Sequence, residues 1–349
     1  MLGLALQKLT KHLKRLPFLP VKNDNPLNQA IKLCTDDMKL VNDCIHDNLQ
    51  SDIPMIPAIG HYIINSGGKR LRPLLCLLIA KMFDYQGGRH IPLAVVIEFI
   101  HTASLLHDDV VDSSDFRRSN PSANAVWGNQ ASVLVGDYLF SRSFQMLVQD
   151  DDMNMLKLMA DVTNALAEGE VLQLSRTFHL EMTEEECLEV IERKTAILFA
   201  AAAEVGAHVS GQSEKIIQDM TEYGMCLGVA FQLMDDALDY LSDEEAAGKP
   251  VGHDLEEGKI TLPLIHAMQQ DAELRARVHT IAERDENPYH EGDREWVRDR
   301  VLQHGGTEYA MKKAQVYANR AIALLPDVQN QHIRTLLCDL ANFSAQRIY

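Results

Sequence analysis

The sequence predicts an all-α protein, a bundle of helices without an extended sheet. Between about residue 25 and residue 349, apolar residues recur at spacings of three and four, which places them on one face of a helix. No segment alternates apolar and polar residues over several positions, as a half-exposed strand would. Leu, Ala, Met and Glu are frequent, and these residues favour helices.

The composition is that of a single globular domain. Of the 349 residues, 46% are hydrophobic and 24% are charged, and no stretch is long or polar enough to separate two domains. We therefore expect one domain at residues 25–349, preceded by a basic extension at residues 1–24. This leucine-rich extension has no acidic residue before Asp24. Two alternatives remain open for it: an amphipathic helix on an anionic membrane surface, or a disordered or misassigned start.

Charge and cysteine usage exclude several classes of function. The formal net charge of -17 argues against nucleic-acid binding, which depends on clustered Lys and Arg. The six cysteines include no Cys-x-x-Cys pair, so we expect reduced thiols, no zinc site and a cytoplasmic protein. No apolar run reaches the roughly 18 residues that a membrane span needs. Contact with the inner face of a membrane would therefore be peripheral.

Clusters of Gly, Pro and acidic residues divide the chain into helices. The breaks are expected at residues 84–92, 149–154, 242–259 and 284–294. Thr183 followed by Glu186 forms a capping box, which predicts the start of the helix that carries Lys194.

An Asp-Asp-x-x-Asp cluster ends the apolar run before residue 108. In LLHDDVVDSSDFRR, Asp108 and Asp112 are four residues apart and so share a helical face, with Asp109 beside them. Like charges at this spacing repel, so a cation is expected there. Mg²⁺ typically takes one or two carboxylates together with phosphate oxygens and waters.

The cluster recurs in FQLMDDALDY, which contains Asp235, Asp236 and Asp239. One such cluster is usually a solvated helix face. Two of them, each preceded by apolar residues, indicate a metal-dependent diphosphate site at the mouth of a helix bundle.

A basic segment supplies the positive charge that a diphosphate requires. SGGKRLRP places two glycines, which allow an anion to approach closely, directly before Lys69, Arg70 and Arg72 at an expected helix start. This pattern predicts a phosphate pocket. The alternative is an ordinary turn with surface cations.

Other cations stand near these clusters. Arg117 and Arg118 would contact phosphate oxygens or pair at the surface with Asp112 or Asp115. Lys194, next to Thr195, lies on a very apolar helix and so needs a partner anion.

The segment GKPVGHDLEEGK carries Lys249 and Lys259. It would close over bound phosphate as a lid or serve as a flexible connection. His101, in EFIHTASLL, is by itself more typical of a satisfied core residue than of a ligand. A di-iron site is excluded, because such bundles need two Glu-x-x-His motifs and Glu98-x-x-His101 is the one in the chain.

These motifs, in this order, resemble the trans-isoprenyl diphosphate synthases, particularly long-chain bacterial enzymes of the octaprenyl type. The resemblance runs from about residue 25 to the C-terminus and also includes GEVLQL at residues 169–174. It implies the isoprenoid synthase fold, a single-domain helical bundle around a deep central cavity. It also implies a homodimer, and Mg²⁺ with three ions per site when diphosphate is bound.

The resemblance assigns roles to particular residues. It implies that isopentenyl diphosphate is bound by Lys69, Arg70, Arg72, His101 and Arg118. It implies that the metal and the allylic diphosphate are held by Asp108, Asp109, Asp112, Asp235, Asp236, Asp239, Arg117, Lys194, Lys249 and Lys259. Thr195 and Gln232 would direct oxygen dipoles toward the allylic carbocation.

The resemblance also bears on product length. Ala103 and Ser104, four and five residues before Asp108, are small where short-chain relatives have aromatic side chains. With Ile100 deeper and a floor from Phe140, Phe144 and Met146, we expect a long product, octaprenyl diphosphate, made from farnesyl diphosphate for a quinone side chain. Alternatives are a shorter, geranylgeranyl product or a non-catalytic subunit of a heteromeric synthase.

One position departs from the pattern, because Ser119 stands where most relatives have Gly after the two arginines. A terpene cyclase is the nearest enzymatic rival, but it would not need a second diphosphate pocket.

Overall fold

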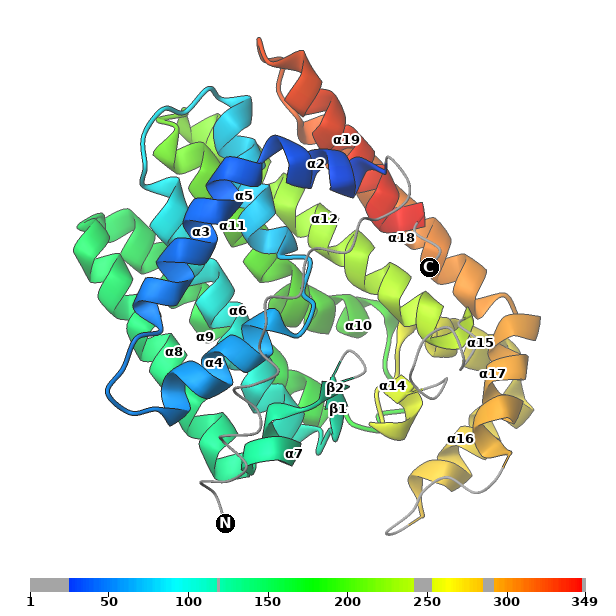
Figure 1. The fold of residues 1–349 in the computed structure, drawn as a ribbon. Coiled ribbons are helices and arrows are strands. Elements are labelled where there is room, and N and C mark those ends of the chain that lie inside the picture. The colour runs from blue at the N-terminus through cyan, green and yellow to red at the C-terminus, as the bar shows by residue number, and fades with distance from the viewer. Residues whose placement is uncertain (1–24, 118–119, 242–252, 285–291, 347–349) are drawn as a thin grey trace.

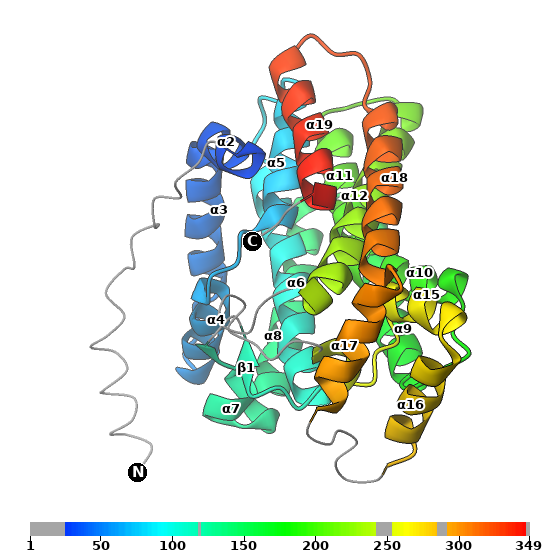
Figure 2. The ribbon, with the colours of Figure 1, turned by 90° about the vertical axis from the view of Figure 1, so that its right-hand side faces the viewer.

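The computed structural model describes residues 25–117, 120–241, 253–284 and 292–346, and helices dominate these residues. The predicted extension at residues 1–24 lies outside them. The central helices are α5 (Leu71–Met82), α6 (His90–Val111), α11 (Ile197–Val209) and α12 (Glu214–Leu241). Figure 2 shows these helices standing upright next to α18 and α19 at the C-terminal end of the chain.

The N-terminal and middle helices surround this centre (Figure 1). They are α2 (Pro26–Leu33), α3 (Thr35–Asn48), α4 (Met55–Asn65), α7 (Ala123–Trp127), α8 (Asn129–Asp150), α9 (Met153–Ser175) and α10 (Glu184–Ile191). At the start of helix α2, Asn25 caps the helix by accepting a hydrogen bond from the Asn28 amide at 2.9 Å, and proline occupies the first turn.

The C-terminal helices complete the bundle on the other side. They are α14 (His253–Glu256), α15 (Leu262–Gln270), α16 (Ala272–Ala282), α17 (Asp293–Gln303), α18 (Gly306–Leu324) and α19 (Gln331–Gln346). A single hydrophobic cluster runs through the described residues from α2 to α19. Within the described residues, the extended structure consists of two short strands, β1 (Phe116–Arg117) and β2 (Asn120–Pro121), which pair antiparallel.

The expected helix breaks at residues 84–92 and 149–154 coincide with the α5–α6 and α8–α9 connections. Parts of the other two expected breaks, residues 242–252 and 285–291, lie outside the described residues. The capping box is present, with the Thr183 side chain accepting from the Glu186 amide and the Glu186 carboxylate accepting from the Thr183 amide.

Helix α6 forms the core of the bundle. Its apolar residues extend over 22 positions, which is long enough to cross a membrane, but 67% of its most apolar window is buried inside the fold. Glu98 and His101 also lie within this helix. The burial indicates a central helix of the bundle, whose C-terminal end carries the first aspartate cluster.

Candidate active site

The first aspartate cluster lies at the C-terminal end of α6, where Asp112 is the last, capping residue. Asp108 lines a cavity of about 550 Å³ in the centre of the bundle. Burial raises the pKa of Asp108, and the neighbouring charge of Asp112 raises it further, although Lys194 and Arg117 oppose the shift. Carboxylates that disfavour each other's charge in this way are suited to sharing a cation.

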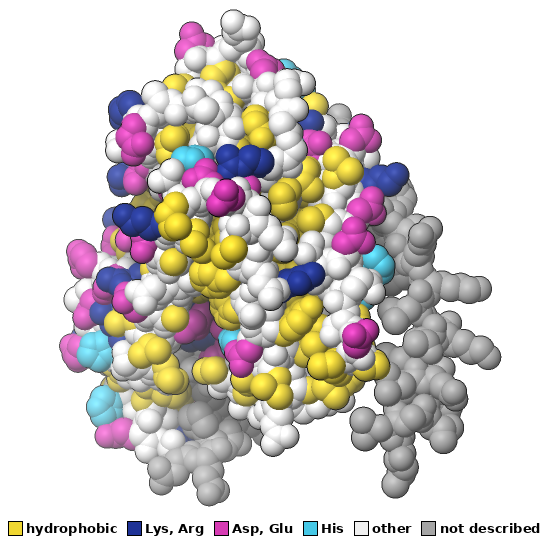
Figure 3. Space-filling view, turned by 90° about the vertical axis from the view of Figure 1, so that its left-hand side faces the viewer, with side chains coloured by type: hydrophobic (Ala, Val, Ile, Leu, Met, Phe, Trp, Pro, Cys, Tyr) yellow, Lys and Arg dark blue, Asp and Glu magenta, His cyan; other side chains and the backbone are white. Residues whose placement is uncertain are grey.

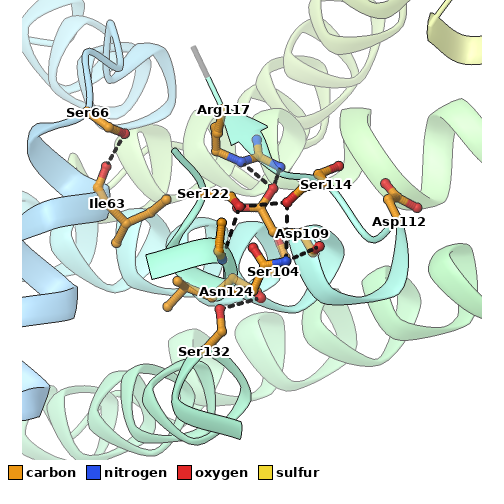
Figure 4. Close-up of polar contacts among 12 residues, drawn as sticks. Ile63, Ser66, Ser104, Asp109, Asp112, Ser114, Arg117, Ser122, Asn124 and Ser132 are labelled. Carbon is orange, nitrogen blue, oxygen red and sulfur yellow. Dashed lines mark hydrogen bonds and ion pairs between the residues drawn. The ribbon is translucent and has the colours of Figure 1, made fainter. Parts of the chain in front are cut away.

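Asp109 faces Arg117, whereas Asp112 lies apart from this contact (Figure 4). Its carboxylate is fully buried and accepts hydrogen bonds from Arg117, at 2.8 Å from Nε and 2.7 Å from a terminal nitrogen. Asn124 donates to the Asp109 carbonyl at 3.0 Å and also to the Ser114 carbonyl. Asp109 therefore anchors the β1–β2 hairpin that presents Arg117 to the cavity. Arg118 lies outside the described residues.

The predicted basic pocket opens into the same cavity. Arg70 caps α5 in the left-handed backbone conformation, at φ 48°, and Lys69, Arg70 and Arg72 all line the cavity. Arg72 lies 3.1 Å from Nε2 of His101 and stacks over the ring of Phe199 at 4.4 Å. The start of α5 therefore gathers three cations at the wall of the cavity that Asp108 and Asp235 also line.

Glu98 is a residue of this pocket that the sequence did not single out as a ligand. It is 7% exposed and lines the cavity one helical turn before His101. Burial lowers the pKa of Arg70, and the negative charge of Glu98 opposes that shift. Glu98 thus helps to keep the pocket charged before an anion binds.

Lys194 and Thr195 lie on a π-helical turn, η1 (Glu192–Ala196), between α10 and α11. Gly169 on α9 allows this turn to approach closely, since a Cβ there would lie 2.8 Å from the Lys194 amide nitrogen. Lys194 donates to Glu170 at 2.6 Å and to Gln173 at 2.7 Å. The anion that Lys194 was expected to need is therefore Glu170, from the GEVLQL motif.

The second aspartate cluster lies on α12. One of its side chains lines the cavity, and another is buried in the core. Asp235 lines the cavity, whereas Asp236 is 4% exposed and accepts from Gln232 at 2.8 Å. Asp239 accepts a hydrogen bond from the Asp254 amide at 3.2 Å. The Thr195 hydroxyl donates to Gln232 at 3.0 Å, so the α12 side chains meet the π-helical turn.

Lys259 connects the loop after α14 with the first cluster. Its ammonium group lies 3.2 Å from Asp112 and 2.5 Å from Glu257. Burial alone would lower the pKa of Lys259, but these two carboxylates raise it above its ordinary value. Lys259 therefore stays charged beside the aspartates. Lys249 lies outside the described residues.

Some of the residues expected to set product length lie on α6 at or beside the cavity, and the others lie on α8. Ser104 lines the cavity, whereas Ala103 and Ile100 are fully buried next to it. Phe140, Phe144 and Met146 lie on α8, which packs along α6, with the Phe140 ring 5.8 Å from the ring of His107.

The donors at this site fit a magnesium ion that is shared with a substrate. Within the described residues, no group of three or more His, Cys, Asp or Glu side chains is arranged to hold a metal alone. Mg²⁺ prefers oxygen ligands and usually takes one or two carboxylates, filling its shell with phosphate oxygens and waters. Asp108, Asp112 and Asp235 offer such carboxylates near a cavity that also holds the cations for a diphosphate.

The profile of the Polyprenyl synthetase family matches residues 53–297. This chain belongs to the polyprenyl synthetase family. It is 43% identical to the octaprenyl diphosphate synthase of Haemophilus influenzae over 328 residues, which cover 93% of this chain and 98% of that protein. The Escherichia coli octaprenyl diphosphate synthase is also 43% identical, over 92% of this chain and 99% of the relative.

Solved structures of polyprenyl synthetases have the same fold. A polyprenyl synthase from Caulobacter crescentus, complexed with calcium and isoprenyl diphosphate, superimposes with a TM-score of 0.87 at 40% identity. The match covers 94% of this chain and 99% of that one. A decaprenyl diphosphate synthase from Rhodobacter capsulatus gives the same TM-score and identity, over 93% and 100%.

Membership of the polyprenyl synthetase family confirms the predicted all-α isoprenoid synthase fold and a trans-prenyltransferase of the long-chain class. Members of the family use Mg²⁺. Prenyl diphosphates as substrates are consistent with membership of this family. Besides Glu98, sequence reasoning missed Glu170 and Gln173, to which Lys194 donates hydrogen bonds. The signal for both was the GEVLQL motif, together with the need of Lys194 for an anion.

Glu170 should make the stability of the metal-free protein depend on pH. Burial and the charges of Asp108 and Asp112 raise its pKa to about 7, against the opposing effect of Lys194. Because the folded pKa exceeds the ordinary 4.5, the stabilising contribution is complete below about pH 4.5 and is lost as pH rises through 7. The change in unfolding free energy is at most about 3 kcal/mol.

Thermal melting between pH 5.5 and 7.5, in chelator, measures this effect. The Tm of the wild-type protein should fall with rising pH, and the Tm of the Glu170→Gln variant should fall less steeply. Equal slopes for the two proteins would contradict the assignment.

Proposed function

We propose that this protein condenses farnesyl diphosphate with successive isopentenyl diphosphates, in the trans configuration, to octaprenyl diphosphate. One observation supports this most strongly. A single cavity is lined by aspartates from both clusters, Asp108 and Asp235, and by the basic pocket of Lys69, Arg70 and Arg72. Two diphosphates can therefore be held at once, which a condensation of two diphosphate substrates requires.

The allylic diphosphate is held on the aspartate side. Mg²⁺, three ions per site, would neutralise the leaving diphosphate, with Asp108, Asp112, Asp235 and Asp239 as ligands. Lys194 and Lys259 stand at this side as cations for the phosphate oxygens. Lys249 is expected to join them.

Arg117, which lines the cavity, completes the cations of this side. Its guanidinium is already oriented by Asp109, so little order is lost when it contacts phosphate. Prearranged charges of this kind stabilise the separation of the diphosphate from the allylic carbocation.

Isopentenyl diphosphate is held on the basic side by Lys69, Arg72 and His101, with Arg118 assisting. Its double bond then faces the allylic carbon and attacks the carbocation as the diphosphate departs. A new carbon–carbon bond forms, and loss of a proton regenerates a double bond. The departing diphosphate is the proton acceptor, and Thr195 and Gln232 face their oxygens toward the positive charge.

The two substrate sites can be separated by mutation. Arg72→Met should raise KM for isopentenyl diphosphate by about 10- to 100-fold, the loss expected when a charged hydrogen-bonding group is removed. Lys194→Met should instead raise KM for farnesyl diphosphate. The measurement is steady-state incorporation of labelled isopentenyl diphosphate with each substrate varied in turn. Equal effects of both variants on both substrates would contradict two separate sites.

The protein is further proposed to act as a homodimer through a face formed by α8 and α9. Large apolar side chains on these antiparallel helices are at least 62% exposed, namely Leu134, Val148, Met153, Val171 and Leu174. Their spacings, 14 residues on α8 and 18 and 3 residues on α9, are close to whole numbers of helical turns and place them on one side of each helix. Figure 3 shows apolar side chains gathered on the side of the molecule where α8 and α9 lie in Figure 1. An apolar patch of this kind is typical of an interface.

Sedimentation should therefore give twice the chain mass of 39.2 kDa. Leu134→Glu combined with Val171→Glu should give the single mass, because two charges would be buried in the interface. Val316→Glu, at a 61% exposed position on α18, is the matched control and should stay dimeric. A wild-type protein that sediments as a monomer would refute the interface.

The proposed role of the product is a quinone side chain, which follows from its length. A cytoplasmic enzyme that makes a long apolar product would release it more readily when bound at a membrane surface, because the bilayer takes up the apolar chain. Residues 1–24, proposed as a basic extension in front of one catalytic domain, could provide such peripheral contact.

A further inference from the structure

Asp236 stands apart from the other aspartates of the second cluster. Asp235, its neighbour in sequence, lines the reaction cavity, whereas the Asp236 side chain turns into the bundle and is 4% exposed. Its Oδ1 accepts a hydrogen bond from Nε2 of Gln232, one helical turn earlier, at 2.8 Å.

The hydrogen bond from Gln232 fixes which way its amide points. An amide has a donating NH₂ group and an accepting oxygen, and Nε2 of Gln232 donates to Oδ1 of Asp236. The NH₂ group therefore faces Asp236, and Oε1 faces the Thr195 hydroxyl, which donates to it at 3.0 Å. The Thr195 oxygen and the Gln232 carbonyl thus present lone pairs at the wall of the reaction cavity.

This pair also borders two cavities. Thr195 and Gln232 line the reaction cavity of about 550 Å³. With Lys194 they also line a smaller cavity of about 120 Å³, whose other polar residues include Asp236, Asp254, Arg176 and Lys259 and whose apolar lining includes Val190 and Ile191. Its volume and its polar side chains leave room for water molecules. The Thr195–Gln232 pair therefore borders both the site of the carbocation and a space that can hold water.

We propose that Asp236 is a positioning residue: it holds the Gln232 amide so that the Thr195–Gln232 pair keeps its oxygens toward the carbocation and closes the wall against water. This inference rests on the proposed function. If the amide is released, its NH₂ group can face the cation, and water can reach the allylic carbon. The water oxygen would then bond to that carbon and lose a proton, giving the allylic alcohol in place of the elongated product.

A metal-ligand role for Asp236, which the sequence motif suggests, makes different predictions. Asp236→Asn keeps an accepting oxygen of the same size but is a poor magnesium ligand. A positioning role predicts that this variant needs the same Mg²⁺ concentration for half-maximal rate as the wild type. Asp235→Asn, the adjacent residue facing the cavity, is the matched comparison and should need more Mg²⁺.

Asp236→Leu removes the acceptor and should lower kcat by about 10- to 100-fold, the usual effect of losing a supporting hydrogen bond to a site residue. KM for farnesyl diphosphate should stay within about twofold, and the ratio of farnesol to elongated product should rise severalfold. In a Gln232→Leu background, the same substitution should add little, because Asp236 acts through Gln232. Thermal melting and calorimetric binding of inorganic diphosphate with Mg²⁺ provide readouts that do not depend on turnover.

Two results would overturn the positioning role. One is a rise in the Mg²⁺ requirement of Asp236→Asn equal to that of Asp235→Asn. The other is a loss of kcat on Asp236→Leu that is equally large in the wild-type and in the Gln232→Leu background. If Asp236→Leu does not fold, the Mg²⁺ titration of Asp236→Asn and its farnesol ratio decide alone. Failure of the proposed function would differ, because the wild-type protein itself would then not elongate farnesyl diphosphate.

Discussion

Asp108→Ala and Asp235→Ala should each lower the rate of elongation by about 100- to 1000-fold. Each substitution removes a carboxylate from the cavity wall where the leaving diphosphate must be neutralised, and loss of one prearranged electrostatic group commonly costs 100- to 1000-fold. The two clusters lie on different helices, α6 and α12, so neither can replace the other. Incorporation of labelled isopentenyl diphosphate at saturating substrates measures the effect.

Asp161→Ala is the control for this prediction, because Asp161 is exposed on α9. Its activity should remain near that of the wild type. If Asp108→Ala or Asp235→Ala kept a rate within tenfold of the wild type, that cluster would have no part in the chemistry.

Ser104→Phe should shorten the product. Ser104 lines the cavity one turn from Asp108, and a turn of helix is about 5.4 Å long, so a ring there would obstruct the growing chain soon after it leaves the metal site. Ser104→Ala, which adds no bulk, should leave product length unchanged. Chromatographic sizing of the products measures the outcome, and octaprenyl diphosphate from Ser104→Phe would contradict the path of the chain along α6.

Ala103→Phe should shorten the product as well, but with a loss of stability. Ala103 is fully buried beside the cavity, so a ring must displace packed neighbours, at a cost of about 1 to 3 kcal/mol. Shortening at both positions would place the growing chain along this part of α6. If only the Ser104 variant gave a shorter product, the growing chain would run along the face of α6 that carries Asp108.

Much of this architecture was predictable because it depends on local spacing. Periodicity of three and four predicted the helices, and the i to i+4 relation of Asp108 and Asp112 put both at the end of one of them. The capping box at Thr183 depends on residues three positions apart. An apolar helix around Lys194 predicted a partner anion, although not its identity.

The remaining features depend on contacts between distant segments or on backbone geometry without a local signature. Arg117 pairs with Asp109 because a hairpin of two-residue strands, too short to show alternation, folds back on α6. The π-helical turn that presents Thr195 to Gln232 has no recognisable sequence pattern, and the two residues are 37 positions apart. Burial of Asp236 could not be inferred either, because adjacent aspartates in one motif are equivalent in sequence alone.

The size of the product tests the central claim most directly. The purified protein is incubated with farnesyl diphosphate, an excess of labelled isopentenyl diphosphate and Mg²⁺, and the products are dephosphorylated and separated by chain length. Octaprenyl alcohol as the main species is the predicted result. Geranylgeraniol as the end product would contradict the long-chain assignment, and a folded protein that incorporates no isopentenyl units would contradict the function itself.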